Sequence, residues 1–132
     1  MSGFSRRAAV VTGGAGGIGA GIAARLAADG FRVIVLDQAE PAAQVDRFHV
    51  VDLSDAAAVQ ALCARIAAEE EVTCLVNNVG IVCPAPLEEG DPADFDRLLH
   101  VNLRPSILCA QAFLPGMKAA GGGRIPSCWG KP

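Results

Sequence analysis

Residues 8–19 read AAVVTGGAGGIG, and this stretch decides the fold. The apolar run Ala8–Val11 enters a glycine cluster, which is the pattern of a buried strand that ends in a tight loop. From Ile18 to Leu26 apolar side chains recur at helical spacing, and Gly30 stands where a glycine commonly ends a helix. The chain therefore begins with a predicted strand, a glycine loop and a helix.

Further strands and helices alternate along the rest of the chain. Strands are expected at Arg32–Leu36, Phe48–Val51 and Cys74–Val76. Arg124-Ile125 begins a fifth strand, which Pro126 fits poorly because proline cannot donate to a central ladder. This alternation predicts an α/β fold: a Rossmann-like, doubly wound parallel sheet with helices on both faces and the first strand in the middle.

The second helix is expected to begin at Ser54, which is a good N-cap residue. Val59, Leu62 and Ile66 then form one helical face that runs up to the acidic residues 69–71.

Proline and glycine mark a loop at Ile81–Gly90. Asp91 then caps a helix whose first residue is a proline, a favoured order at a helix start. The helical pattern continues to about Ala120, with interruptions expected at Pro105 and Pro115.

Composition and charge bound the class of protein. The 132 residues suffice for one domain, and 52% hydrophobic with 19% charged residues is typical of soluble globular proteins. The net charge is −3 and no basic stripe occurs, so neither a nucleic acid nor an anionic membrane is an expected partner. The polar start Met1–Arg7 and the short apolar run behind it resemble neither a signal peptide nor a membrane span, so we expect a cytoplasmic protein.

The five cysteines are scattered, with no C-x-x-C spacing and no histidine pair at ligand spacing. We expect reduced, mostly buried thiols and no metal site.

The glycine loop predicts a dinucleotide site. Glycines at such a loop allow a tight turn, a close approach of the backbone to a diphosphate, and close packing of helix on sheet; the diphosphate then lies at the positive end of the helix. Three known spacings fit: Gly14, Gly16 and Gly19; Gly13, Gly17 and Gly19; or Gly13, Gly16 and Gly19. The loop alone does not choose among them.

Asp37 ends the second expected strand, twenty residues after Gly17. A carboxylate at this place can bind both ribose hydroxyls of NAD and repels a 2′-phosphate. Gln38 and Gly16, its neighbours, are not basic. We therefore expect NAD as the cofactor, in preference to NADP.

Two further motifs give a family resemblance. Asn77-Asn78-Val79-Gly80 resembles the N-N-A-G motif of classical short-chain dehydrogenases/reductases, and Asp52-Leu53 resembles their acidic–apolar pair. The N-N-A-G match favours this branch over the extended, epimerase-like branch and over a methyltransferase. The resemblance covers Ala8 to Ile125 and implies this cofactor-binding set: Gly13, Gly17, Ile18, Gly19, Asp37, Asp52, Leu53, Asn78 and Gly80.

Two of the implied roles have plainer alternatives. In the family the carboxylate at the place of Asp52 accepts a hydrogen bond from the adenine amino group, but by itself Asp52 is equally a turn acid. Asn102 matches the family's catalytic asparagine, which holds a water that relays protons to the active-site lysine. Without the resemblance, Asn102 is a solvated residue or marks a helix irregularity beside Pro105.

The resemblance implies an NAD(P)-dependent oxidoreductase that transfers hydride between NAD and a secondary alcohol or ketone, in a family that is usually homo-oligomeric. Its chemistry needs a serine after the fifth strand and then Tyr-x-x-x-Lys, in which the lysine brings the tyrosine pKa from near 10 toward the working pH. This sequence has no tyrosine, and neither Lys118 nor Lys131 stands in that context. The family serines would fall near Trp129 and Gly130, and Ser127 comes too early.

The break after Ile125 is abrupt. We therefore expect residues 1–132 to be a single, incomplete NAD-binding Rossmann domain, truncated after about the fifth strand and ending in an aberrant tail at 126–132. A reading-frame slip or a premature end would explain it. The alternatives are a non-catalytic NAD-binding module and a non-functional fragment.

Overall fold

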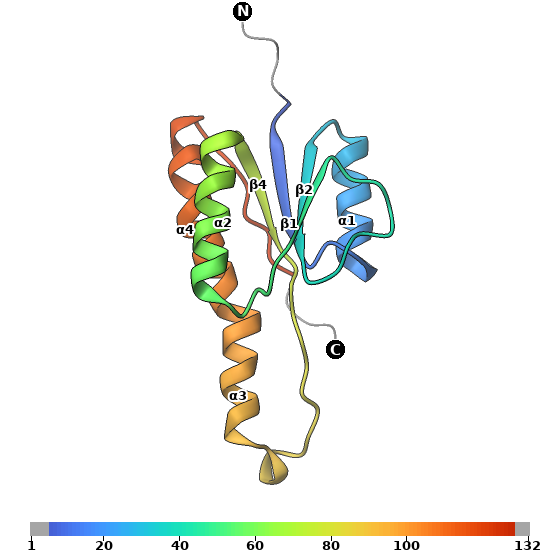
Figure 1. Ribbon diagram of the computed structural model, residues 1–132, viewed down its shortest axis with the longest axis vertical. Helices are drawn as coiled ribbons and strands as arrows, with labels where there is room; N and C mark the ends of the chain where they lie inside the picture. The colour runs from blue at the N-terminus through green and yellow to red at the C-terminus, as the bar shows by residue number, and fades with distance from the viewer. Residues whose placement is uncertain (1–5, 129–132) are drawn as a thin grey trace, which may run out of the picture.

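A parallel sheet forms the centre of the structure, a computed structural model that describes residues 6–128 (Figure 1). Its strands are β1 (Ala8–Thr12), β2 (Arg32–Asp37), β3 (Arg47–Val50) and β4 (Val72–Asn77). Their order is β3-β2-β1-β4, and every neighbouring pair is parallel. The predicted doubly wound sheet with the first strand inside is confirmed.

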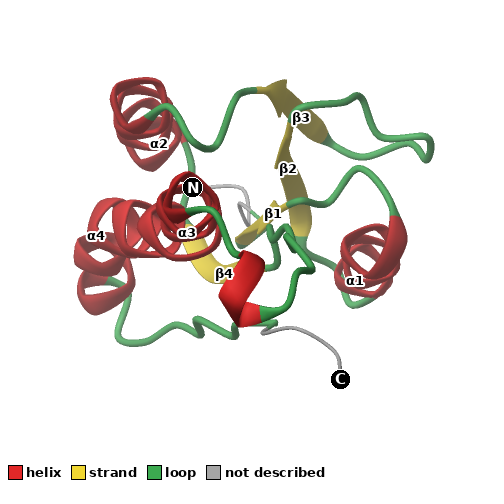
Figure 2. Ribbon diagram, turned by 90° about the horizontal axis from the view of Figure 1, so that it is seen from below, coloured by secondary structure: helices red, strands yellow, loops and turns green. Residues whose placement is uncertain are grey.

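Helices cover both faces of this sheet (Figure 2). On one face lies α1 (Gly17–Ala28), and on the other lie α2 (Ala56–Glu69) and α4 (Arg104–Ala119). Successive side chains of a strand point to opposite faces of the sheet, so an inner strand contributes to a hydrophobic core on each face. Val10 packs with residues of α2 and α4, whereas Val11 packs with residues of α1.

The short helix α3 (Pro92–Leu98) extends beyond the carboxyl ends of the strands (Figure 1). The segment 81–91 leads to it and contains one turn of 3-10 helix, η1 (Leu87–Glu89), so the predicted loop is confirmed. Asp91 caps α3 as predicted, because its carboxylate accepts the backbone N–H of Ala93 at 2.9 Å.

One predicted cap is wrong. Asp55, and not Ser54, caps α2: its Oδ1 accepts the N–H of Ala58 at 3.1 Å. The Ser54 hydroxyl instead donates to Asp52 Oδ1 at 2.6 Å, so it serves the turn that precedes the helix. At the end of α1 the prediction holds, since Gly30 has a φ of 92°.

The helical irregularity expected beside Pro105 lies just before it. A π-helical segment, η2 (Leu99–Leu103), separates α3 from α4. Pro105 then stands in the first turn of α4, which follows the π segment without a break, and it has no N–H to donate to a carbonyl of the preceding turn. The interruption predicted at Pro115 is wrong, because α4 continues through Pro115 to Ala119.

The segment 124–128 lies along the free edge of β4. Arg124 exchanges two backbone hydrogen bonds of 2.9 Å with Thr73 and Leu75, and the Pro126 carbonyl accepts the Asn77 N–H at 3.0 Å. Pro126 has no N–H to continue the ladder, and the pairing is reduced to two isolated parallel bridges. The fifth strand therefore occupies its predicted place in this reduced form. Trp129 and Gly130, where the family serines were expected, lie outside the described residues.

None of the helices within residues 6–128 has the length and apolar character needed to cross a membrane.

Candidate functional site

The predicted site residues meet at the carboxyl edge of the sheet. In a parallel sheet all strands end at the same edge, so the segments after β1, β2 and β4 converge there. A pocket of about 280 Å³ is lined by residues that include Gly13, Asp37, Leu53 and Asn78. A neighbouring pocket has a volume of about 680 Å³. Its lining includes Ile18, residues 77–82 and Asn102.

The loop after β1 depends on glycine at three places. Gly13 and Gly17 have φ values of 65° and 56°, which favour glycine. A Cβ on Gly19 would overlap the Gly13 carbonyl oxygen and lie 2.5 Å from Asn78 Nδ2. Gly19 therefore lets α1 begin close against the sheet, whereas a Cβ on Gly17 would meet no protein atom within 4 Å.

The start of α1 offers backbone donors to an anion. Its N-cap is Gly16, which supplies no side-chain cap, and its first turn holds no acidic residue. Free N–H groups and the positive end of the helix dipole favour a negative group there. The open space beside Gly17 gives a diphosphate room to approach, so the loop fits a dinucleotide.

Asp37 is half-buried where β2 ends. Its Oδ2 accepts the Ala15 N–H at 2.9 Å and its Oδ1 accepts the Gln38 N–H at 2.7 Å. Each carboxylate oxygen has a further lone pair, so Asp37 can hold the glycine loop and still accept hydrogen bonds from a ligand.

Asp52 is exposed beyond β3 and forms a turn. Its Oδ1 accepts the Ser54 hydroxyl at 2.6 Å and the Ser54 N–H at 2.9 Å, with Gln38 Nε2 at 3.4 Å. The two hydrogen bonds from Ser54 lower the pKa of Asp52. Leu53 beside it is only 2% exposed and packs in the core while forming part of the pocket wall. Asp52 is therefore a turn acid in this structure, as the plainer alternative predicted. These hydrogen bonds all use its Oδ1, and Oδ2 takes no part in them.

A buried hydroxyl that the sequence prediction did not single out joins two strand ends. Thr12 is 0% exposed, and its Oγ1 accepts the N–H groups of Asn78 at 3.1 Å and Val79 at 3.2 Å. The Asn78 side chain adds a hydrogen bond in the opposite direction, since its Nδ2 donates to the Gly13 carbonyl at 3.0 Å. Together these hydrogen bonds hold the glycine loop against the Asn77–Gly80 turn.

We expect Thr12→Val to lower the free energy of unfolding by about 2–4 kcal/mol, because two partly buried N–H groups would lose their acceptor. Thr12→Ser keeps the oxygen and is the matched control. Urea unfolding followed by circular dichroism measures both variants. Equal stability of the two would show that the hydroxyl bonds contribute nothing.

Asn102 lies in the π-helical segment η2, and its side-chain amide forms two hydrogen bonds with the backbone of Ile81. Its Oδ1 accepts the Ile81 N–H at 2.7 Å, and its Nδ2 donates to the Ile81 carbonyl at 2.9 Å. Single-turn π segments occur often at functional sites. The side chain is therefore neither simply solvated nor free: it holds the chain just after Gly80, at the wall of the larger pocket.

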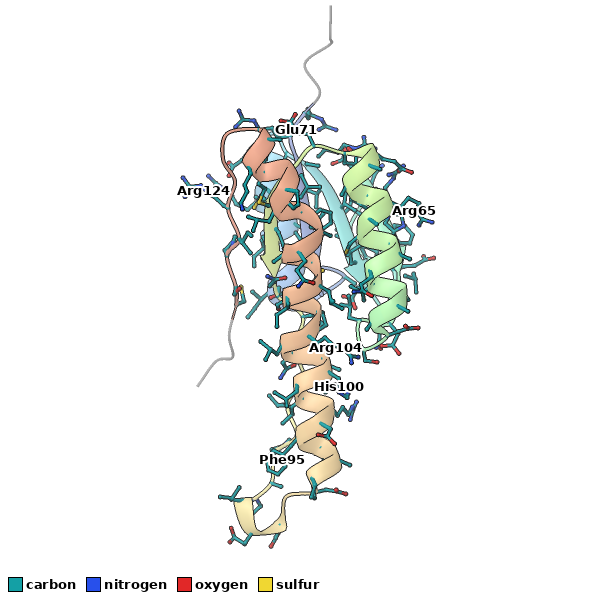
Figure 3. The ribbon with its side chains drawn as sticks, turned by 90° about the vertical axis from the view of Figure 1, so that its left-hand side faces the viewer. Arg65, Glu71, Phe95, His100, Arg104 and Arg124 are labelled. Carbon is teal, nitrogen blue, oxygen red and sulfur yellow. The ribbon has the colours of Figure 1, made fainter. Side chains whose placement is uncertain are left out.

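Arg104 lies at the start of α4, where this helix continues from the π segment (Figure 3). Its guanidinium donates to the Ser54 carbonyl, so the helix that follows Asn102 is tied to the Asp52 turn. Nothing in the local sequence indicates this contact, because the two residues are 50 positions apart.

The lining of the larger pocket includes Asn77, whose side-chain oxygen is a hydrogen-bond acceptor. Asn77 is 6% exposed, and its Oδ1 has no hydrogen-bond partner among the described residues. Ser106 and Cys128 line the same pocket. Among residues 6–128 no group of three histidine, cysteine or acidic side chains could hold a metal ion.

Known proteins resemble this chain in sequence and in architecture. A family model described as short chain dehydrogenase matches residues 7–127. The cis-4-hydroxycyclohexanecarboxylate dehydrogenase of Sinomonas cyclohexanicum is 41% identical over 134 residues, covering 92% of this chain and 54% of that protein. The D-threitol dehydrogenase of Mycolicibacterium smegmatis is 37% identical over 131 residues, covering 90% of this chain and 50% of that protein.

A solved structure of a metagenomic short-chain oxidoreductase in complex with NADP superposes with a TM-score of 0.84. It is 35% identical, and the match covers 93% of this chain and 62% of that one. The chain thus spans about half the length of the curated relatives it matches.

Proposed function

Because the chain belongs to the short-chain dehydrogenase family, we propose that it binds NAD and forms the cofactor-binding part of an oxidoreductase acting on a secondary alcohol or its ketone. One observation carries the proposal: the glycine loop, Asp37 and the Asn77–Gly80 turn border one continuous edge of the sheet. The relatives named above are dehydrogenases of hydroxylated compounds, which supports this reaction class.

Each part of the edge suits one part of NAD. The backbone N–H groups at the start of α1 bind the diphosphate. Asp37 accepts the hydroxyls of the adenosine ribose, and Asp52 Oδ2 accepts the adenine amino group beside Leu53. Ile18 and Gly80 border the larger pocket, where we place the nicotinamide end.

When bound, the nicotinamide ring supplies the hydride acceptor or donor. The residues of this chain bind and orient it. Asn102 holds the Ile81 backbone and thereby the wall of the larger pocket. In the proposed enzyme this asparagine also positions the water of the proton relay.

The sequence contains no tyrosine, so these 132 residues hold no tyrosyl acid or base. This observation favours a second candidate function for the chain by itself: a module that binds NAD without turning over a substrate.

We expect Gly17→Ala to weaken NAD binding at least about tenfold, because the added methyl group enters the space proposed for the diphosphate. Gly30→Ala is the matched control. Gly30 also has a positive φ, 92°, and open space around it, but it lies at the far end of α1. Both variants are measured by isothermal titration calorimetry with NAD and by thermal unfolding.

Both substitutions introduce backbone strain of about 1 kcal/mol, so both lower the unfolding temperature. Only Gly17→Ala is expected to lose affinity. If the two variants bind NAD equally, the diphosphate does not approach Gly17. If the unsubstituted, folded chain shows no affinity for NAD, the proposed function fails for this chain.

A further inference from the structure

Two thiols face each other in the core between α2 and α4. Cys63 and Cys109 are both 0% exposed, and their sulfur atoms are 3.7 Å apart. The two helices lie side by side on one face of the sheet (Figures 1 and 2). Both cysteines belong to the core cluster formed there.

The other cysteines are placed differently. Cys74 is buried in the core cluster on the opposite face of the sheet, against α1. Cys83 is half-buried in the loop before η1, and Cys128 is exposed beside β4. The fold therefore brings together one pair out of five thiols.

We propose that Cys63 and Cys109 form a reversible disulfide that joins α2 to α4 when the chain meets a two-electron oxidant such as hydrogen peroxide. The two sulfur atoms are 3.7 Å apart, so they must approach each other by less than about 2 Å to reach the disulfide bond length of about 2.05 Å. A peroxide molecule is small enough to enter through local opening of the helix pair.

The chemistry balances with peroxide alone. The Cys63 thiolate attacks one peroxide oxygen, the O–O bond breaks, and the departing hydroxide takes up the thiol proton as water. Cys109 then attacks the sulfenic sulfur, the S–O bond breaks, and a second water leaves with the Cys109 proton. The two thiols lose two electrons and two protons, and one peroxide becomes two waters.

The two thiols share one hydrogen bond, and either sulfur can donate it. The attack on peroxide can therefore equally begin at Cys109, and the disulfide formed is the same.

The disulfide would close a loop of the chain that contains β4, the Asn77–Gly80 turn and Asn102, since its ends are 46 positions apart. Closing such a loop removes entropy from the unfolded chain. We expect the oxidised form to unfold about 5–15 °C higher than the reduced form.

The test uses the double variant Cys83→Ser/Cys128→Ser, which removes the two cysteines that are not fully in the core. The folded protein is treated with hydrogen peroxide, freed of oxidant, unfolded, alkylated and digested with trypsin. Cleavage after Arg65 and Arg97 places Cys63, Cys74 and Cys109 on three different peptides. We expect the Cys63 and Cys109 peptides to be linked and Cys74 to be alkylated.

A Cys63→Ser change in the same background is the control, and it should abolish both the link and the rise in unfolding temperature. A reducing agent should reverse both in the parent variant. Three alkylated cysteines after treatment, or a link that includes Cys74, would overturn the proposal. The same peptide mapping on the unsubstituted chain provides an independent measurement that needs no variant to fold.

Discussion

Gly19→Ala is expected to destabilise the chain by about 3 kcal/mol or more, because a single methyl group overlaps the Gly13 carbonyl oxygen and crowds Asn78 Nδ2. Those two atoms are themselves hydrogen-bonded at 3.0 Å. Neither can move without breaking the link between the glycine loop and the turn after β4. The cost therefore includes a lost hydrogen bond as well as the overlap.

Gly21→Ala is the matched control, one half-turn along the same helix. A Cβ there meets no atom within 4 Å, and Gly21 has no positive φ. We expect this change to stabilise the chain by about 0.5–1 kcal/mol, the usual gain on replacing an exposed helical glycine. Urea unfolding of both variants gives the difference. A Gly19→Ala protein as stable as Gly21→Ala would contradict the close packing of α1 against the sheet.

Local signals predicted the fold well because each acts within a few residues. The glycine loop, the end of α1 at Gly30 and the cap at Asp91 are all decided by neighbours in the sequence. The N-cap of α2 shows the limit of such signals. Ser54 and Asp55 are both good caps, and the choice depends on Asp52, which binds the Ser54 hydroxyl.

The side-chain hydrogen bonds that hold the site together could not be predicted from the sequence. The hydroxyl of Thr12 meets the backbone of Asn78, 66 positions away, and Asn102 meets Ile81, 21 positions away. Such contacts depend on the crossover connections that bring separate strand ends to one edge. The motif residues were predicted by resemblance, but the atoms they bind within the protein follow only from the fold. Their roles toward a cofactor remain predictions.

Asp37 should make the chain prefer NADH to NADPH by about tenfold or more. The carboxylate stands where β2 ends and lines the pocket that we assign to the adenosine ribose. A 2′-phosphate a few ångströms away carries charge of the same sign. The repulsion amounts to about 1 kcal/mol at the dielectric of bulk water and about 4 kcal/mol at that of a protein surface. Gln38 and Gly16 offer no positive charge to offset it.

Asp37→Asn removes the charge with little change in size, and we expect it to reduce the NADH preference by about tenfold. It weakens NADH binding, because the amide nitrogen cannot accept a ribose hydroxyl, and it relieves the repulsion of the phosphate. Glu40→Gln removes an equal charge from an exposed residue three positions on, so it controls for net charge. Titrating the fluorescence of both reduced cofactors gives the four dissociation constants for the two variants.

The ratio of the two affinities, and not either affinity alone, isolates the role of the carboxylate. Asp37 also holds the glycine loop through Ala15, so its replacement loosens the loop for both cofactors alike. That common loss cancels in the ratio, whereas the repulsion of the 2′-phosphate does not. If Asp37→Asn and Glu40→Gln shift the ratio equally, the preference comes from overall charge. If the unsubstituted chain binds both cofactors equally, the ribose does not lie against Asp37, and the adenosine half must be placed elsewhere along the edge.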